Sequence, residues 1–162
     1  MYSKFKKNYV NYLLQSFLVF VCIALLLMLY KLFGGIIVAS LGASSLILFV
    51  SPHSKSAKTK NVVGGYICGI IIGVLCSFIY YKFLGLNFEE LNYILIFLCA
   101  AAAAIATFLM VSTNLVHAPA VSLAIGLSID PECLQLAFAA LIGIVILCVI
   151  RNLLKDHIKN LV

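Results

Sequence analysis

Long apolar stretches dominate the chain, and four of them have the length of a membrane span. They cover residues 12–33, 62–81, 92–112 and 133–150. An α-helix rises about 1.5 Å per residue, so about 20 apolar residues cross the hydrocarbon core of a bilayer. The pattern therefore predicts four long membrane-crossing helices.

Two shorter apolar stretches, residues 34–52 and 116–131, lie between the long ones and differ from them in character. Each has a group of small or helix-breaking residues, then a short apolar run, and then a proline, Pro52 or Pro131. Lipid offers no partner to backbone groups, so helix breaks occur where they are buried in protein or line a cavity. We therefore expect two broken helices, either short half-helices that complete a crossing or re-entrant loops.

The composition agrees with a chain that lies almost wholly in a membrane. Of its 162 residues, 65% are apolar and 10% are charged, whereas about a quarter of the residues of a soluble domain are charged. This argues against a soluble enzyme, a nucleic-acid-binding protein and a disulfide-rich scaffold. We expect residues 1–162 to form one all-α transmembrane domain in the lipid bilayer.

The distribution of basic residues favours six crossings over four. If both broken stretches cross, nine of the eleven basic residues face the cytoplasm, namely Lys4, Lys6, Lys7, Lys55, Lys58, Lys60, Arg151, Lys155 and Lys159. Lys and Arg concentrate on the cytoplasmic side, so we predict a multi-pass protein of the cell membrane with both termini in the cytoplasm. Residues 12–81 and 92–152 would then form two three-span repeats of inverted orientation, as in many transporters.

The broken stretches are where we expect the protein to bind a solute. A helix that begins inside the membrane points unpaired N–H groups and the positive end of its dipole inward, which suits an anion. We expect the solute to lie between two such N-termini, with Lys60 and Asn61 at the inner mouth. The first N-terminus would present Gly42, Ala43, Ser44 and Ser45, and the second would present Asn114, His117, Pro119, Ala120 and Ser122.

Other interpretations of these residues stay open. Small residues also let helices pack closely, and this is our main interpretation of Gly65, Gly69 and Gly73, which recur every four residues. His117 is the one ionisable residue expected deep in the membrane. It could pair with an anion or relay a proton, or it could donate to a carbonyl and hold the break in shape.

The sequence contains no motif for catalysis or metal binding. Its six cysteines form no CxxC pair, and most lie inside apolar runs, where cysteine behaves as a small apolar residue. No phosphate-binding loop and no paired carboxylates within a span are present. We therefore expect no enzyme activity, no cofactor and no bound metal.

Two motifs in the chain are recognisable. The first is made of GASSLILF (42–49), SPHS (51–54) and KNVVGG (60–65), and the second is HAP (117–119). The first resembles the central signature of the HPP family of small membrane proteins, and the second falls where that family has His-Pro-Pro. The resemblance covers about residues 12–152. Some family members of plant chloroplasts and cyanobacteria are implicated in nitrite transport, so the resemblance implies a permease for a small anion.

These observations lead us to expect a membrane transporter or channel for a small monovalent anion such as nitrite. Two alternatives stay open. One is a passive channel for small neutral or cationic solutes, and the other is a structural or accessory membrane subunit that transports nothing. The smooth glycine and alanine faces of the predicted spans also leave a homo-oligomer open.

Overall fold

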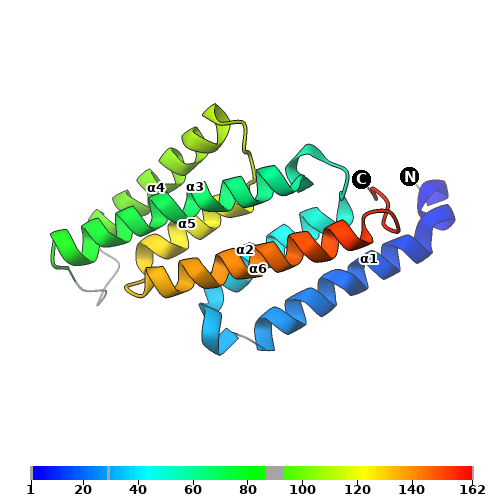
Figure 1. Ribbon diagram of the computed structural model, residues 1–162, viewed down its shortest axis with the longest axis horizontal. Helices are drawn as coiled ribbons and strands as arrows, with labels where there is room; N and C mark the ends of the chain where they lie inside the picture. Colours follow the sequence, from blue (N-terminus) through cyan, green and yellow to red (C-terminus); the bar gives the residue numbers. More distant parts are fainter. Residues whose placement is uncertain (1, 29, 87–92, 162) are drawn as a thin grey trace.

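The polypeptide forms a bundle of helices (Figure 1). In the computed structural model, which describes residues 2–28, 30–86 and 93–161, there are six α-helices and no strand. The helices are α1 (Tyr2–Met28), α2 (Tyr30–Val50), α3 (Thr59–Phe78), α4 (Tyr93–Ser112), α5 (Pro119–Ile129) and α6 (Cys133–Leu154). A short 3-10 helix, η1 (Lys55–Ala57), precedes α3, and a π-helical turn, η2 (Ile79–Phe83), continues it. The predicted all-α fold is confirmed.

Three helices of the described part are long and apolar enough to cross a membrane. They are α3 together with η2, which span Thr59–Phe83, and the helices α4 and α6. Their bounds agree closely with the predicted spans 62–81, 92–112 and 133–150, although Asn92 lies outside the described residues. Apolar length was therefore a sufficient signal for these three helices.

The first predicted span, residues 12–33, is wrong at its C-terminal end. The helix α1 ends at Met28 and α2 begins at Tyr30, so residues 30–33 belong to the second helix. Hydropathy continues across this junction because only Lys31 interrupts the apolar run. Tyrosine and lysine favour the membrane surface. The adjacent residues Tyr30 and Lys31 are therefore the sequence signal for the end of the first crossing.

The first of the two predicted helix breaks is absent. The helix α2 runs without interruption for 21 residues, or about 31 Å, so the half-helix beginning at Gly42 is wrong. In lipid a helix satisfies its own backbone groups, and this outweighs the weak helix preference of Gly and Ser. Gly42 faces α1, where a Cβ would lie 3.8 Å from the Ile23 side chain, an ordinary contact distance, so the packing there does not require a glycine.

The second predicted break is confirmed. The helix α5 begins at Pro119 and has 11 residues, so it is about 16 Å long and crosses about half of the hydrocarbon core. It follows a non-helical segment, residues 113–118, in which Asn114 has a left-handed φ of 56°. Proline suits the first position of a helix, since the N–H that it lacks would have no intrahelical partner there.

A row of glycines brings α3 and α5 together. A Cβ on Gly69 would lie 2.4 Å from the carbonyl oxygen of Ala120, and one on Gly73 would lie 2.7 Å from that of Ala124. Only glycine admits a neighbouring backbone at these distances. The packing role predicted for these glycines is confirmed, and α5 also packs on α4 and α2.

Several of the helix contacts fit two units of three helices, although α3 packs on α4 without a comparable contact between α6 and α1 in the described residues. The contact between α1 and α2 in the first unit corresponds to the contact between α4 and α5 in the second. In the same way, the contact between α2 and α6 corresponds to the contact between α5 and α3. At the centre α2 meets α5 and α3 meets α6, and successive helices run in opposite directions (Figure 1). An inverted repeat requires these pairings. The repeat itself, with units at 12–81 and 92–152, stays a prediction.

Both termini lie at the same end of the bundle as the connection between α2 and α3 (Figure 1). The C-terminal tail is fixed there, because the Tyr12 hydroxyl of α1 donates to the Leu161 carbonyl over 3.1 Å. The buried Arg151 of α6 donates to the Pro52 carbonyl in that connection. This arrangement agrees with an even number of crossings, and the side of the membrane on which this end lies stays a prediction.

The outer surface of the helices is apolar, and several buried side chains are polar. Exposed aromatic residues occur on α1, α4 and α6, namely Phe17, Phe20, Phe97, Phe108 and Phe138. Such a surface suits a lipid environment, whereas water would favour the opposite arrangement. The protein is therefore a membrane protein with several apolar helices.

Candidate functional site

Four polar side chains meet inside the bundle, where α2, α3 and the start of α5 come together. They are Ser40 and Ser44 of α2, Tyr66 of α3, and His117 in the segment before α5, and none is more than 1% exposed. We call these four residues the polar cluster. Polar groups are costly at membrane depth unless they have hydrogen-bond partners, so their meeting requires an explanation.

The polar cluster is held by a continuous series of hydrogen bonds. The Tyr66 hydroxyl lies 2.9 Å from the hydroxyls of both Ser40 and Ser44. Ser44 Oγ also lies 2.9 Å from His117 Nε2, and His117 Nδ1 lies 3.1 Å from the Ser56 carbonyl oxygen. At the other end Ser40 donates to the Pro119 carbonyl over 2.9 Å. The series thus joins α2, α3, the α2–α3 connection and the start of α5.

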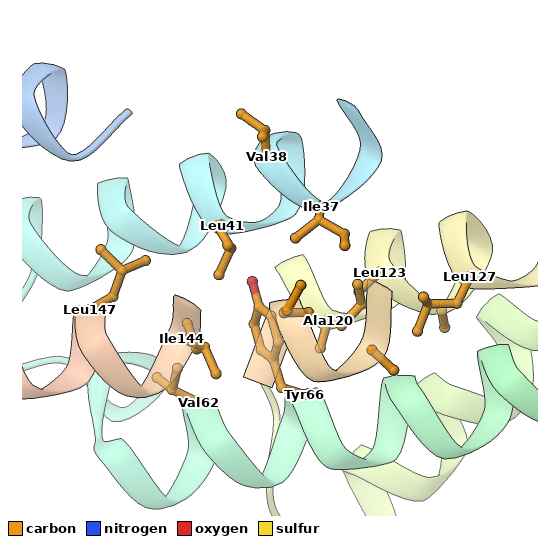
Figure 2. Packing of buried hydrophobic residues seen from close by; sticks show 14 of the residues in the cluster. Ile37, Val38, Leu41, Val62, Tyr66, Ala120, Leu123, Leu127, Ile144 and Leu147 are labelled. Atoms are coloured by element: carbon orange, nitrogen blue, oxygen red, sulfur yellow. The ribbon is translucent and has the colours of Figure 1, made fainter. Parts of the chain in front are cut away.

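Local structure places each member of the cluster. Ser40 and Ser44 are four residues apart and therefore share one face of α2. Figure 2 shows the Tyr66 hydroxyl pointing from α3 toward α2 among the buried side chains Leu41, Ala120 and Ile144. The Tyr66 and His117 rings lie with centroids 5.8 Å apart.

Glycine at position 65 lets the segment before α5 approach α3. A Cβ on Gly65 would lie 2.8 Å from His117 Cβ and 3.1 Å from the Leu115 carbonyl oxygen. A side chain at this position would push His117 away from Ser44. Gly65 is therefore part of what forms the cluster.

Two of the predicted site residues, Ser44 and His117, lie in the polar cluster and contact each other. Pro119 contributes its backbone carbonyl to the series. The neighbouring residues of α2 do not take part. Ser45 is buried but donates to the Gly42 carbonyl over 2.7 Å, and Ala43 is exposed.

The second group of predicted residues is brought together only in part. Asn114 and Ser122 are exposed, and Ala120 is buried beneath Gly69 of α3. The amide of Ala120, expected to be unpaired, donates to the His117 carbonyl, and the next amide, that of Val121, donates to the Ala118 carbonyl. The prediction of two facing half-helix tips with unpaired amides is therefore wrong, because α2 is continuous and the first turn of α5 uses these amides itself.

Lys60 and Asn61 lie in the first turn of α3, at the end of the bundle that carries both termini. Lys60 is exposed, whereas Asn61 is buried and donates its side-chain amide to the Lys55 carbonyl over 3.0 Å. Asn61 therefore stabilises the α2–α3 connection, the same connection that presents the Ser56 carbonyl to His117. The exposed Lys55 and Lys58 make this connection basic.

Ser40 and Tyr66 were missed as site residues by the sequence analysis. The spacing of Ser40 and Ser44 places two hydroxyls on one helix face, which was a readable signal. Tyr66 had a weaker signal, since one tyrosine in an apolar helix is common at membrane surfaces as well. Only the packing of α3 and α2 on the same two helices, α5 and α6, places its hydroxyl next to the two serines.

The described residues contain no group of three or more His, Cys, Asp or Glu side chains that could hold a metal ion. The six cysteines are free thiols, and Cys22, Cys76, Cys133 and Cys148 are buried. The chemistry of the polar cluster is therefore that of hydroxyl and imidazole hydrogen bonds.

The fold and the polar cluster together describe a helical membrane protein with several apolar helices and a buried hydrogen-bonded cluster beside the short helix α5. The family model of the HPP transmembrane region matches residues 4–160. The protein belongs to the HPP transmembrane family, as its motifs indicated. Comparison with curated proteins and with solved structures gives no match.

Proposed function

We propose that this protein carries a small monovalent anion of the size of nitrite across the membrane, and that the anion binds at the polar cluster. The observation that supports this most strongly is the buried series of hydroxyl and imidazole groups at the start of α5. Intramembrane polar groups are costly and usually functional. Transporters place their binding sites where helices are discontinuous.

The chemistry of the cluster favours an anion over a cation. Its side chains offer O–H and N–H donors, and within the described residues no carboxylate hydrogen-bonds to any of the four members. The positive end of the α5 dipole points toward the segment that contains His117. Exposed lysines of the α2–α3 connection, Lys55 and Lys58, together with Lys60, would raise the local concentration of an anion at that end.

The cluster is closed to solvent, so the proposed transport needs a conformational change. Ser44 and His117 are fully buried, and their contact joins α2 to the segment before α5. The bond between Ser40 and the Pro119 carbonyl joins the same two elements. An anion that accepts hydrogen bonds from Ser40 and Ser44 would replace these contacts and separate α2 from α5.

Flux in proteoliposomes tests the proposal. We expect the purified protein to carry nitrite. Inhibition of nitrite flux by nitrate, formate and chloride would show which size of anion the site prefers. Ser44→Ala should reduce nitrite flux about tenfold or more, because an anion bound there loses a charge-assisted hydrogen bond worth about 1.5–3 kcal/mol. The matched control is Ser128→Ala, since Ser128 is also buried but donates to Ala124 within its own helix over 2.7 Å.

Other outcomes would contradict the proposal in different ways. Equal flux in Ser44→Ala and Ser128→Ala would place the pathway away from the polar cluster. Flux of a neutral solute or of a cation in place of nitrite would favour a passive channel. The absence of any flux, together with a second membrane protein that co-purifies with this one, would favour an accessory subunit.

A further inference from the structure

The hydrogen bonds of the polar cluster form a linear series that ends at a backbone carbonyl on each side. One end is the Ser56 carbonyl, which faces His117 Nδ1, and the other is the Pro119 carbonyl, which faces Ser40. Between them lie the contacts His117–Ser44, Ser44–Tyr66 and Tyr66–Ser40. The series therefore has five contacts, each of which needs one hydrogen atom.

A neutral polar cluster has only four hydrogen atoms for these five contacts. Ser40, Ser44 and Tyr66 supply one hydroxyl hydrogen each, and a neutral imidazole supplies one N–H. Carbonyl oxygens only accept, so His117 Nδ1 donates to Ser56 and Ser40 donates to Pro119. Ser44 can donate to Nε2 and Tyr66 to one serine. One contact of 2.9 Å between two oxygens or between oxygen and nitrogen then has no hydrogen.

Protonation of His117 supplies the missing hydrogen. An imidazolium donates from both nitrogens, so Nε2 donates to Ser44, Ser44 to Tyr66, and Tyr66 to Ser40. All five contacts are then filled, with each hydroxyl donating one hydrogen bond and accepting one. We infer that the polar cluster is a proton-binding site in which His117 takes up the proton and the three hydroxyls reorient to accommodate it.

The surroundings of His117 contain few other groups that could take the proton. Tyr66 of α3 contacts its ring, and the thiol of Cys148 on α6 is also buried. The α2 helix contributes the hydroxyl of Ser44, and α4 brings the Met110 side chain close to Gly65. The lysines that flank Ser56, Lys55 and Lys58, are exposed. Among the described residues, His117 has no charged hydrogen-bond partner.

In the described part of the chain, a proton on His117 therefore has no charged hydrogen-bond partner to balance it. A buried, unpaired imidazolium is unfavourable in a low-dielectric interior, and a bound monovalent anion would neutralise it. Proton and anion should consequently bind together, and they should cross the membrane in a ratio of one to one without net charge movement. This second step rests on the proposed function, whereas the proton-binding site does not.

Titration of His117 tests the proton-binding site without any measurement of transport. The protein is labelled with ¹⁵N-histidine, placed in lipid nanodiscs and followed by NMR as the pH changes, and His117→Gln identifies the His117 signal. Tyr66→Phe removes one hydroxyl hydrogen and two contacts. The series with neutral His117 then has three hydrogen atoms for three contacts and is complete. Ser40→Ala has the same effect through its own two contacts.

Both variants should bind the proton more weakly than the wild type. We expect the His117 titration midpoint to fall by about one pH unit, a tenfold loss of proton affinity, because protonation no longer completes a hydrogen bond. Ser128→Ala should leave the midpoint unchanged. An unchanged midpoint in both Tyr66→Phe and Ser40→Ala, or a wild-type His117 that does not titrate between pH 4 and pH 8, would overturn the inference. A purely structural role for Tyr66 would alter stability and leave the midpoint in place.

Coupling to the anion is tested with nitrate, whose conjugate acid does not form near neutral pH. An inward nitrate gradient should acidify the interior of proteoliposomes that contain the wild type, with one proton taken up for each nitrate. A membrane potential set with potassium and valinomycin should not change the rate of nitrate uptake. Nitrate flux that carries current without protons would overturn the coupling and leave anion transport standing. A midpoint that shifts as expected without flux of any anion would support the proton site and contradict the proposed function.

Discussion

The close approach of α3 and α5 makes a sharp prediction about Gly69. In the substitution Gly69→Ala, the added methyl group would lie 2.4 Å from the Ala120 carbonyl oxygen. Ordinary contact begins at about 3.4 Å, so the new atom is about 1 Å too close. The atom it meets belongs to the backbone of α5 and cannot rotate away as a side chain does. The two helices must therefore separate.

The size of the effect follows from two opposing contributions. Overpacking of a well-packed interior costs about 1–3 kcal/mol and occasionally more. We expect the upper end of this range, because the separation of the helices also loosens the contact between Gly73 and the Ala124 carbonyl. Alanine is favoured over glycine in a helix by about 1 kcal/mol. The net loss in the free energy of unfolding should be about 2 kcal/mol.

Unfolding in mixed detergent micelles measures this loss. The protein is titrated with sodium dodecyl sulfate, and its helix content is followed by circular dichroism. The matched control is Gly42→Ala, since a Cβ there meets only the Ile23 side chain at 3.8 Å. We expect Gly42→Ala to be as stable as the wild type or slightly more stable. Equal stability of the two variants would refute the close packing of α3 on α5.

Two further predictions concern the ends of the bundle. Lys58→Cys and Glu132→Cys each place a cysteine at an exposed position. The two cysteines should react with a membrane-impermeant maleimide from opposite sides of the membrane. Labelling of both from one side would contradict the alternating crossings. Arg151→Lys should lower the free energy of unfolding by about 1–3 kcal/mol, because one ammonium group cannot replace the guanidinium bonds to the Pro52 carbonyl and to Asn152. The same detergent titration measures this change, and an unchanged value would mean that Arg151 does not hold the α2–α3 connection.

Hydropathy predicted most of the helices but not the continuity of α2. The helices α3, α4 and α6 are long apolar runs, and their length alone identifies them. The two shorter stretches look alike in sequence, yet only the one with Pro119 inside it is broken. Proline removes a backbone donor and prevents a helix from continuing through it. Glycine and serine only weaken a helix in water, and lipid restores it.

The candidate site was predicted in its location more than in its chemistry. Ser44 and His117 were expected near each other because both lie beside presumed breaks, and they do form a contact. The expected ligands were backbone amides, but the amides of Ala120 and Val121 are used within the first turn of α5. The donors that remain are side-chain hydroxyls. Their positions depend on how α2 and α3 face each other, which no local pattern in the sequence determines.

The contacts of α5 indicate how a closed polar cluster could open under the proposed function. The α5 backbone lies against Gly69 and Gly73 of α3, and separation there would leave gaps that no side chain fills. In the cluster, α2 contacts the start of α5 and the segment before it through the hydroxyls of Ser40 and Ser44. A hydroxyl can exchange a carbonyl or imidazole partner for an anion and keep its hydrogen bond. Opening between α2 and α5 is therefore less costly than opening between α3 and α5. Under the proposed function, α3 and α5 would move together as one body. The second body would be α2 together with α1, which packs on it.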